Sequence, residues 1–249
     1  MSDLLSGDLE ILGRILPASN HTFLATIDTT KVVYKPVTGE RPLWDFPHGT
    51  LAGREVAAFL VSGLLGWDLV PETVLRDGPF GVGMVQRWCE PDGPAAVDVV
   101  ARGQVPEGWC HVLDARGAHD EEVSLVHEDS PALRRLAVFD LLTNNTDRKG
   151  GHILSMSDGR RLGVDHGICF HVDDKVRSVL WGWAGQRLTE AEQEGVEMFT
   201  QVPTDGWGLS DLLEESELVA MSQRAQRLAD EGVFPTPTGE WPAIPWPPF

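Results

Sequence analysis

Short apolar segments separated by small polar turns fill the first third of the chain. Each segment alternates apolar with polar side chains or is rich in β-branched residues, and both patterns are typical of strands. Two segments flank Asp77 and Gly78, which predicts an antiparallel pair joined by a turn at these residues. The predicted strands cover residues 9–16, 22–27, 31–35, 69–74 and 81–86.

Apolar residues at helical spacing dominate the rest of the chain. They recur three and four positions apart after Thr50, which is a candidate N-cap. Ser130 and Pro131 supply a cap and a first turn for a later helix. Residues 95–130 show no clear period, and we expect a helix and loops there. The predicted helices cover residues 51–65, 133–142, 189–199 and 208–231.

The order of these elements predicts an α+β protein with two lobes. Residues 1–90 would form a β-rich N-lobe with one helix that acts as a nucleotide lid, and residues 91–232 a mainly helical C-lobe. The change in composition at Pro91–Pro94 is our candidate hinge. Residues 233–249 hold six of the seventeen prolines, so this tail cannot be helical. It either packs on the protein's own surface or serves as a ligand for a partner.

Composition and charge narrow the classes of partner. The 249 residues are 42% hydrophobic and 23% charged, as in globular proteins, and no apolar run approaches the ~20 residues of a membrane helix. The net charge of −18 argues against nucleic acid and anionic membranes as partners. Three scattered cysteines and an acidic start without the order of a signal peptide favour a reducing compartment. We therefore expect a cytoplasmic protein with no stable membrane association.

The stretch from Asp140 to Phe170 carries the candidate chemistry. An apolar run ends in a burst of polar residues that includes Asp147, and two short strand-like segments follow, the second ending at Asp165. Such a hairpin brings two carboxylates together, which suits a divalent cation and a base beside a phosphate. Asp147 is the candidate base or hydroxyl-orienting group, and Asp165 a hard oxygen ligand for Mg²⁺. Taken singly, each aspartate also fits an ordinary turn.

Two neighbours extend this set. Arg148 can either neutralise a phosphate or hold the loop that carries Asp147. His152 follows Asp147 by five positions and is placed for a second metal contact.

The first turn and the third strand supply candidate phosphate contacts. Ser19, Asn20 and His21 lie in a short polar turn whose backbone N–H groups can cover phosphates. Lys35 ends the third strand and can reach the same oxygens. Together they predict an ATP site under the N-terminal strands.

Two further residues are candidates for positioning the nucleotide. Glu55 lies near the start of the first helix, where it either pairs with Lys35 or is a solvated glutamate that suits the helix dipole. Backbone groups from Gln86 to Trp88, before the candidate hinge, would contact the edge of an adenine.

The central stretch also resembles known motifs. Asn145-Thr146-Asp147-Arg148 and Val164-Asp165-His166-Gly167-Ile168-Cys169-Phe170 are similar to motifs of the phosphatidylinositol 3/4-kinase-like superfamily. The likeness is closest to type II phosphatidylinositol 4-kinases, which read NTDRG..N and IDNG.AF, and extends to compact actinobacterial kinase-like proteins and HipA-type kinases. It implies a two-lobed, protein-kinase-like fold that binds ATP with Mg²⁺ or Mn²⁺. It also implies that Asp147 is the catalytic aspartate, Asp165 the metal-binding aspartate and Lys35 the phosphate-binding lysine.

One departure from these motifs bears on activity. His152 stands where the families have a metal-binding asparagine, and imidazole suits Mn²⁺ or softer metals better than Mg²⁺. This leaves three possibilities: a preference for Mn²⁺, catalysis with one metal, or a protein that binds nucleotide without transfer. The cysteine-rich palmitoylation segment of the type II lipid kinases is absent from this sequence. Together with the charge, this makes phosphoinositide a poor candidate substrate.

We therefore expect an atypical kinase, an ATP-dependent phosphotransferase that acts on a hydroxyl of a protein or a small molecule. One alternative is a pseudokinase, a nucleotide-binding module without transfer activity. Another is a nucleotidyltransferase that uses ATP.

Overall fold

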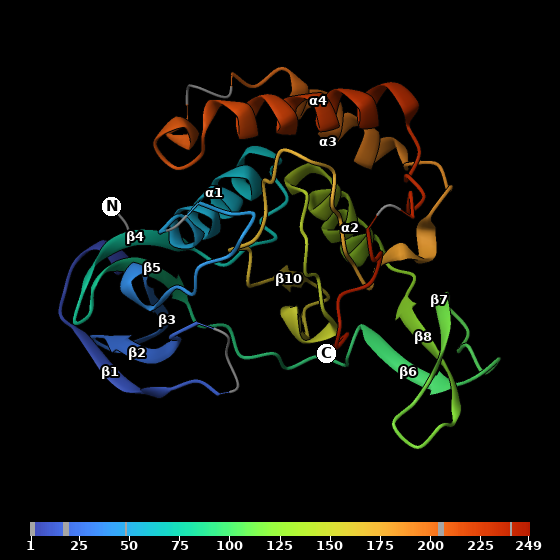
Figure 1. The fold of residues 1–249 in the computed structure, drawn as a ribbon, viewed down its shortest axis with the longest axis horizontal. Coiled ribbons are helices and arrows are strands. Elements are labelled where there is room, and N and C mark those ends of the chain that lie inside the picture. Colours follow the sequence, from blue (N-terminus) through green and yellow to red (C-terminus); the bar gives the residue numbers. More distant parts are fainter. Residues whose placement is uncertain (1–2, 17–19, 48, 204–206, 240) are drawn as a thin grey trace.

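The computed structural model describes residues 3–16, 20–47, 49–203, 207–239 and 241–249. Within them the chain is a mixed α/β structure in which a β-rich region comes first and most helices follow (Figure 1). The strands are β1 (Leu9–Arg14), β2 (Phe23–Ile27), β3 (Thr30–Pro36), β4 (Thr73–Gly78), β5 (Gly81–Arg87), β6 (Val97–Ala101), β7 (Trp109–Arg116), β8 (Glu122–Glu128), β9 (Ile153–Ser155) and β10 (Arg161–Gly163). The α-helices are α1 (Leu51–Leu64), α2 (Pro131–Thr143), α3 (Glu190–Thr200) and α4 (Glu215–Glu231). Short 3₁₀ turns are η1 (Asp3–Leu5), η2 (Val37–Gly39), η3 (Gly150–His152), η4 (Trp181–Trp183) and η5 (Leu209–Asp211).

An antiparallel sheet in the order β1-β2-β3-β5-β4 forms the N-terminal region. The prediction of strands here is confirmed, but β4 covers Thr73–Gly78 where the sequence predicted a strand at residues 69–74. Strand β4 begins at Thr73 because Pro71 has no N–H to donate, and Gly78 pairs with Gly81, so the chain turns after Gly78. Strand β3 lies in the middle of the sheet and delivers Lys35 at its end.

Helix α1 packs against β4 and β5. The predicted cap is wrong, because the Thr50 hydroxyl donates to the Pro47 carbonyl and makes no cap bond. Glu40 takes this role instead: its carboxylate accepts the N–H groups of Leu51 (3.2 Å) and Ala52 (2.9 Å). A carboxylate satisfies two free N–H groups and suits the positive end of the helix.

The prediction of a helix and loops in residues 95–130 is also wrong. These residues form a separate antiparallel sheet in the order β6-β8-β7, which projects as an arm at the opposite end of the molecule from β1 (Figure 1). Strand β8 has a buried run from Ser124 to His127, so its apolar residues do not alternate along the chain. A middle strand covered on both faces lacks the period of two that marks a half-exposed strand.

The later helices largely follow the prediction. Helix α2 begins after Ser130, whose hydroxyl accepts the Leu133 N–H, and it ends at Asn144 in the left-handed conformation (φ 52°). Helices α3 and α4 pack on each other. Helix α4 begins only at Glu215, later than the predicted residue 208, because η5 precedes it.

Helix α1 shares its apolar core with the later helices. Its Ala57, Ala58 and Val61 belong to the same buried cluster as residues of α2 and α4. Next to this core, Arg54 of α1 forms a buried ion pair with Glu217 of α4 and donates to the Cys169 carbonyl (2.7 Å). A smaller apolar cluster lies among η1 and strands β1, β2, β3 and β5. Helix α1 therefore packs against the later helices as well as against the N-terminal sheet.

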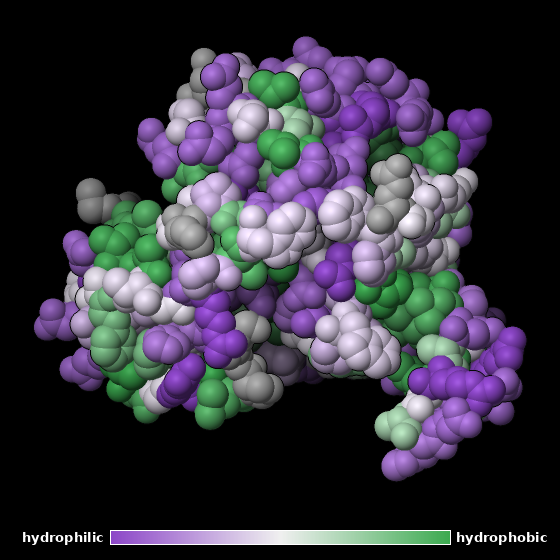
Figure 2. Space-filling model, viewed as in Figure 1, coloured by the Kyte–Doolittle hydropathy of each residue, from purple (hydrophilic) through white to green (hydrophobic). Residues whose placement is uncertain are grey.

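The surface agrees with the high negative charge. In the view of Figure 2, the regions over α3, α4 and the tip of the arm are largely hydrophilic. No helix among the described residues is long and apolar enough to span a bilayer. Cys89, Cys110 and Cys169 are free thiols, as expected from their spacing.

Candidate active site

The stretch between α2 and Phe170 forms a hairpin that carries the candidate catalytic groups. After Asn144 the chain passes through Asp147 and η3 into the β9–β10 pair. The strand β10 ends at Gly163, and Asp165 follows in the left-handed conformation with φ 62°. A non-glycine residue is uncommon in this conformation, and such residues cluster at functional sites.

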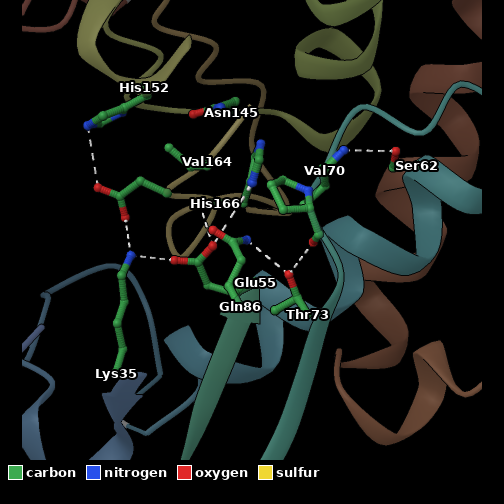
Figure 3. Close-up of polar contacts among 12 residues, drawn as sticks. Lys35, Glu55, Ser62, Val70, Thr73, Gln86, Asn145, His152, Val164 and His166 are labelled. Atoms are coloured by element: carbon green, nitrogen blue, oxygen red, sulfur yellow. Dashed lines mark hydrogen bonds and ion pairs between the residues drawn. The ribbon is translucent and has the colours of Figure 1, made fainter. Parts of the chain in front are cut away.

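Lys35 joins the N-terminal sheet to this hairpin. Its ammonium lies 2.7 Å from Glu55 Oε1 and 2.8 Å from Asp165 Oδ1. Figure 3 shows Lys35 reaching up from the sheet towards Glu55 of α1, with the hairpin residue His152 above them. Of the two interpretations of Glu55, pairing with Lys35 is confirmed and the solvated glutamate is wrong.

The charges in this cluster depend on one another. Burial alone would lower the pKa of Lys35, but Asp165 and Glu55 outweigh burial and raise that pKa above its usual value. The ammonium of Lys35 in turn holds the pKa of Asp165 well below its usual range, against the opposing effect of burial. The lysine is therefore protonated and the aspartate ionised at neutral pH. The Asp165 side chain is still 51% exposed, so part of it is open to a ligand.

His152 is oriented with one nitrogen free. Its Nδ1 lies 3.1 Å from the Asp147 carbonyl oxygen, which can only accept, so Nδ1 carries the ring proton. Burial lowers the pKa of His152, and the ring is neutral at pH 7. Its Nε2 lone pair faces Asp165 Oδ2 at 3.4 Å. An imidazole fixed by a backbone carbonyl in this way is typical of a metal ligand.

These two residues fit a divalent cation that has further ligands from elsewhere. Bonds of about 2.1 Å place neighbouring ligand atoms about 3 Å apart, close to the spacing of Nε2 and Oδ2. Among the described residues no group of three or more His, Cys, Asp or Glu side chains can hold a metal by itself. Mg²⁺ and Mn²⁺ sites often take one or two protein ligands and complete the set with phosphate oxygens and water.

Asp147 faces the same cleft as Lys35 and Asp165. Its backbone N–H donates to Asn145 Oδ1 (3.0 Å), and its Oδ2 lies 3.1 Å from the ammonium of Lys149. The cleft has a volume of about 370 Å³. The residues that line it are Asn20, Lys35, Pro36, Glu40, Arg41, Pro42, Leu43, Leu51, Ala52, Glu55, Asp147, Asp165, Gly167 and Ile168.

Arg148 holds the loop and does not reach the cleft. The side chain is fully buried, and its Nε and Nη2 each lie 2.8 Å from the Asp140 carboxylate. It also donates to the His152 and Val164 carbonyls and to His166 Nε2. All its donors are used by Asp140 of α2 and by groups of the hairpin segment, so a role for Arg148 in neutralising a phosphate, one of its two predicted roles, is wrong.

Comparison with known proteins relates the whole chain to one relative. No known family model matches the chain. Protein Rv2133c of Mycobacterium tuberculosis is 47% identical over 266 residues, in an alignment that covers 99% of this chain and 94% of that protein. The chain belongs to the family of Protein Rv2133c. That name states no activity, so the relationship leaves the chemistry to be argued from the site.

A solved structure shares the fold. The crystal structure of the Helicobacter pylori proinflammatory kinase CtkA matches with a TM-score of 0.50, over 92% of this chain and 94% of that chain. The two sequences are 10% identical. At this identity the likeness shows a kinase-like fold, and the activity of CtkA is a property of that protein.

The predicted lid residues meet the cleft only in part. Asn20 lines it, and its Oδ1 accepts the backbone N–H of Arg41 (2.9 Å). His21 is exposed, packs on the edge of Phe23 and is not part of the cleft wall. Ser19 lies outside the described residues.

The adenine contacts predicted for the backbone from Gln86 to Trp88 remain a prediction, and several groups of this segment are already hydrogen-bonded. Gln86 lies in the middle of the sheet, and its side-chain amide donates to Thr73 Oγ1 (2.9 Å), as Figure 3 shows. The N–H groups of Arg87 and Trp88 donate to Glu72 and Lys31 carbonyls. Sheet pairing therefore occupies these two N–H groups, so they are not free to contact a base.

Three polar residues support the site and were not predicted, and two of them, Asp140 and His166, are buried. Asp140 pairs with Arg148, Glu40 caps α1 beside the cleft, and His166 receives Arg148 while its backbone N–H donates to Glu55 (2.9 Å). A carboxylate within the apolar run of α2 was the available signal for Asp140. The residue Glu40 lies eleven positions before Leu51, too far for a usual capping pattern to find it.

Proposed function

We propose that the protein is an ATP-dependent phosphotransferase that acts on a hydroxyl of a protein or a small molecule. The observation that carries the proposal is the single cleft in which Lys35, paired with Glu55, meets the carboxylates of Asp165 and Asp147. Phosphoryl transfer needs these groups: a cation on the phosphates, a metal-binding carboxylate and a carboxylate for the acceptor hydroxyl. The kinase-like fold, shared with a protein described as a kinase, supports the same reading.

In this proposal Lys35 contacts the phosphates and Glu55 keeps its ammonium in place. Asp165, which pairs with Lys35, would turn its exposed edge to a divalent cation together with His152 Nε2. A bound Mg²⁺ or Mn²⁺ supplies positive charge that neutralises the phosphate oxygens. The adenine would lie against the backbone that follows Trp88.

Asp147 would act on the acceptor. Its carboxylate accepts the proton of the hydroxyl as that oxygen forms a bond to the γ-phosphorus. The bond between the γ-phosphorus and the bridging oxygen breaks, and ADP leaves with the electron pair. Lys149, 3.1 Å from Asp147, would hold the carboxylate in position and add positive charge beside the transferred group.

We further propose that the chain is a distant member of the phosphatidylinositol 3/4-kinase-like superfamily. In this proposal residues 1–90 form an N-lobe, residues 91–232 a C-lobe and residues 233–249 a tail on its surface. The net charge of −18 favours a cytoplasmic acceptor over a phosphoinositide, a membrane or a nucleic acid.

A second candidate function is nucleotide binding without transfer. It is favoured by His152, whose nitrogen ligand is weak for Mg²⁺, and by the direct Lys35–Asp165 pair, which ATP must break. Transfer of AMP instead of phosphate is a third candidate.

ATP labelled at the α or the γ position distinguishes these functions. We expect label from the γ position, and not from the α position, to enter an acceptor with Mg²⁺ or Mn²⁺. The variant Asp147→Ala should lower this transfer by about 100-fold or more, because the hydroxyl loses its base, while ATP binding persists. Asp8→Asn, a change at an exposed aspartate far along the chain from the hairpin, is the control.

Transfer that survives in Asp147→Ala would overturn the proposed role of Asp147. Saturable ATP binding with no transfer of either label would favour the binding module, and incorporation of the α label would favour the nucleotidyltransferase.

A further inference from the structure

A second pocket lies under the tail, outside the cleft. In Figure 1 the chain leaves α4 and runs back past α2 towards the β9–β10 hairpin. On this path Ala243 O accepts the Ser178 N–H (2.9 Å) and the Trp181 Nε1–H (2.8 Å). Between the tail and the helices remains a pocket of about 240 Å³, here called the tail pocket. Its lining residues are Leu141, Asp174, Lys175, Val176, Trp181, Arg224, Arg227, Leu228, Glu231, Pro235, Thr236, Pro237, Thr238, Trp241 and Ala243.

Two guanidinium groups of the tail pocket share one carboxylate. Arg224 Nη1 lies 3.5 Å from Asp174, and Arg227 Nη2 pairs with the same side chain. The third basic residue of the wall, Lys175, is already paired with Asp45 (3.2 Å) and lies 3.9 Å from Asp173, and Glu231 is the other carboxylate of the wall. Two arginines with one carboxylate between them, beside apolar rings, suit an anion.

Arg224 is the residue that points to a ligand. Its side chain is 5% exposed, and its buried Nη2 donates to no acceptor among the described residues. Its other nitrogens donate to the Leu142 and His171 carbonyls and reach Asp174 at 3.5 Å. Burial lowers the pKa of Arg224, and Asp174 offsets this only in part. A buried guanidinium with a spare donor is costly unless an anion completes its contacts.

The remaining wall is apolar and rigid. Lys175 lies under the Trp241 ring, with its ammonium 4.6 Å from the ring centre, and is itself 6% exposed. Trp181 is fixed through its hydrogen bond to Ala243, and Pro235 and Pro237 close the opposite side. Such a wall favours a ligand whose anionic group is attached to a flat or apolar body.

We propose that the tail pocket binds a small molecule with one carboxylate or phosphate group on an apolar body. The anion would complete the contacts of Arg224 and lie near Arg227, and the apolar part would pack on Trp181 and Trp241. This site is separate from the cleft and does not depend on phosphotransferase activity.

The site has a direct connection to the catalytic loop. The Lys175 N–H donates to Asn144 Oδ1 (2.9 Å), and Asn144 Nδ2 donates to the His171 and Asp173 carbonyls. Asn144 begins the loop that carries Asp147. A ligand that orders residues 171–175 therefore also acts on the position of Asp147.

Benzoate and phenyl phosphate test the proposal, with benzyl alcohol as an uncharged probe of similar size. We expect calorimetric titration of the full-length protein to give one saturable site with a Kd on the order of 1 mM for at least one anion. Benzyl alcohol should bind at least about tenfold more weakly, as expected from losing a charge-assisted hydrogen bond. The anion that binds identifies the ligand as a carboxylate or a phosphate.

Variants locate the binding. Arg227→Gln, at a half-exposed residue whose loss leaves the fold intact, should weaken the anion about tenfold, and Arg135→Gln, an exposed arginine outside the pocket, should not. Lys35→Met should leave anion binding unchanged, which separates this site from the cleft. Absence of saturable binding, equal binding of benzyl alcohol, loss of binding in Lys35→Met or equal effects of both arginine variants would overturn the proposal.

Discussion

In the proposed site, His152 would set the preference between Mg²⁺ and Mn²⁺. Its Nδ1 is committed to the Asp147 carbonyl, so only Nε2 can face a cation shared with Asp165. Replacing it with an amide oxygen ligand should favour the harder ion. We expect His152→Asn to raise the ratio of turnover with Mg²⁺ to turnover with Mn²⁺. Steady-state assays with each metal measure this ratio, and an unchanged ratio would show that His152 is not a ligand.

His166 makes the stability of the fold depend on pH. Burial, and then the charge of Arg148, hold the pKa of His166 well below its usual value, and burial also lowers the pKa of His127 and His152. Below about pH 6.5 the unfolded chain binds protons that the folded chain does not, so the free energy of unfolding falls as the pH falls. Protonated His166 would face the Arg148 guanidinium, which donates to its Nε2 at 2.7 Å.

The measurement is urea unfolding between pH 7.5 and pH 5. We expect His166→Gln to reduce the slope of the unfolding free energy with pH by up to about 1.4 kcal/mol per unit, the effect of one proton. His119→Gln, at an exposed residue of the arm, is the control. Equal slopes in wild type and His166→Gln would contradict the argument.

At the scale of single residues, the groups that line the cleft were easier to predict from the sequence than the groups that hold them in place. Lys35, Asp147 and Asp165 stand out because chemistry requires those residue types at the ends of short apolar segments. Asp140, Glu40 and His166 depend on partners that only packing brings close. The phosphate role predicted for Arg148 was wrong, because an arginine next to a candidate catalytic aspartate can bind either a phosphate or a buried carboxylate.

At the scale of elements, the Arg148–Asp140 pair connects α2 to the loop that carries Asp147. Burial alone would lower the pKa of Arg148, but Asp140 raises it above the usual value, so the guanidinium stays charged inside the protein. Removing the carboxylate leaves that charge uncompensated, which costs about 3–5 kcal/mol. We expect Asp140→Asn to lower the free energy of unfolding by about this amount, measured in urea.

An exposed ion pair provides the comparison. Asp158 pairs with Arg160 in the turn between β9 and β10, in water. Asp158→Asn should leave the unfolding midpoint nearly unchanged, because surface pairs contribute little. Equal losses in the two variants would show that burial of the Asp140 pair is not what stabilises the loop.

The arm shows why some elements escape sequence analysis. Strands β2 and β3 have clear turns and a regular register, whereas β8 is covered on both faces and β7 contains a register shift. A bulge changes which face each later residue takes, so the period of two is lost along the strand.

At the scale of the whole molecule, the tail links distant parts of the chain. The Pro248 carbonyl accepts the Gly150 N–H (2.8 Å), and the Phe249 ring packs against Gly150 in η3, next to His152. Packing of the tail on the protein's own surface, the first of its two predicted roles, is therefore present. Its contact with the loop that carries Asp147 could not be predicted from the sequence.

Removing residues 248–249 should affect turnover more than stability. The loop that carries Asp147 and His152 loses a restraint, and small displacements of catalytic groups are costly, so we expect turnover to fall about tenfold or more. Phe249 is half exposed, so little apolar burial is lost and the melting temperature should change little. Trp246→Ala, at a tryptophan that is 78% exposed, is the control. Unchanged turnover in the shortened chain would contradict this role of the tail.

The buried pair between Arg54 and Glu217 bears on how the protein could be switched off. Protein kinases are commonly controlled by swinging the helix that carries the glutamate away from its lysine. Here Arg54 immediately precedes Glu55 in the same helix. Moving the helix would therefore separate the buried Arg54 from Glu217, at a cost of about 3 kcal/mol or more. Fewer than about one molecule in a hundred would then have Glu55 withdrawn. We infer that α1 has no populated position in which Glu55 is withdrawn from Lys35. The rate of the proposed phosphoryl transfer would then follow the abundance of the protein and the supply of its acceptor.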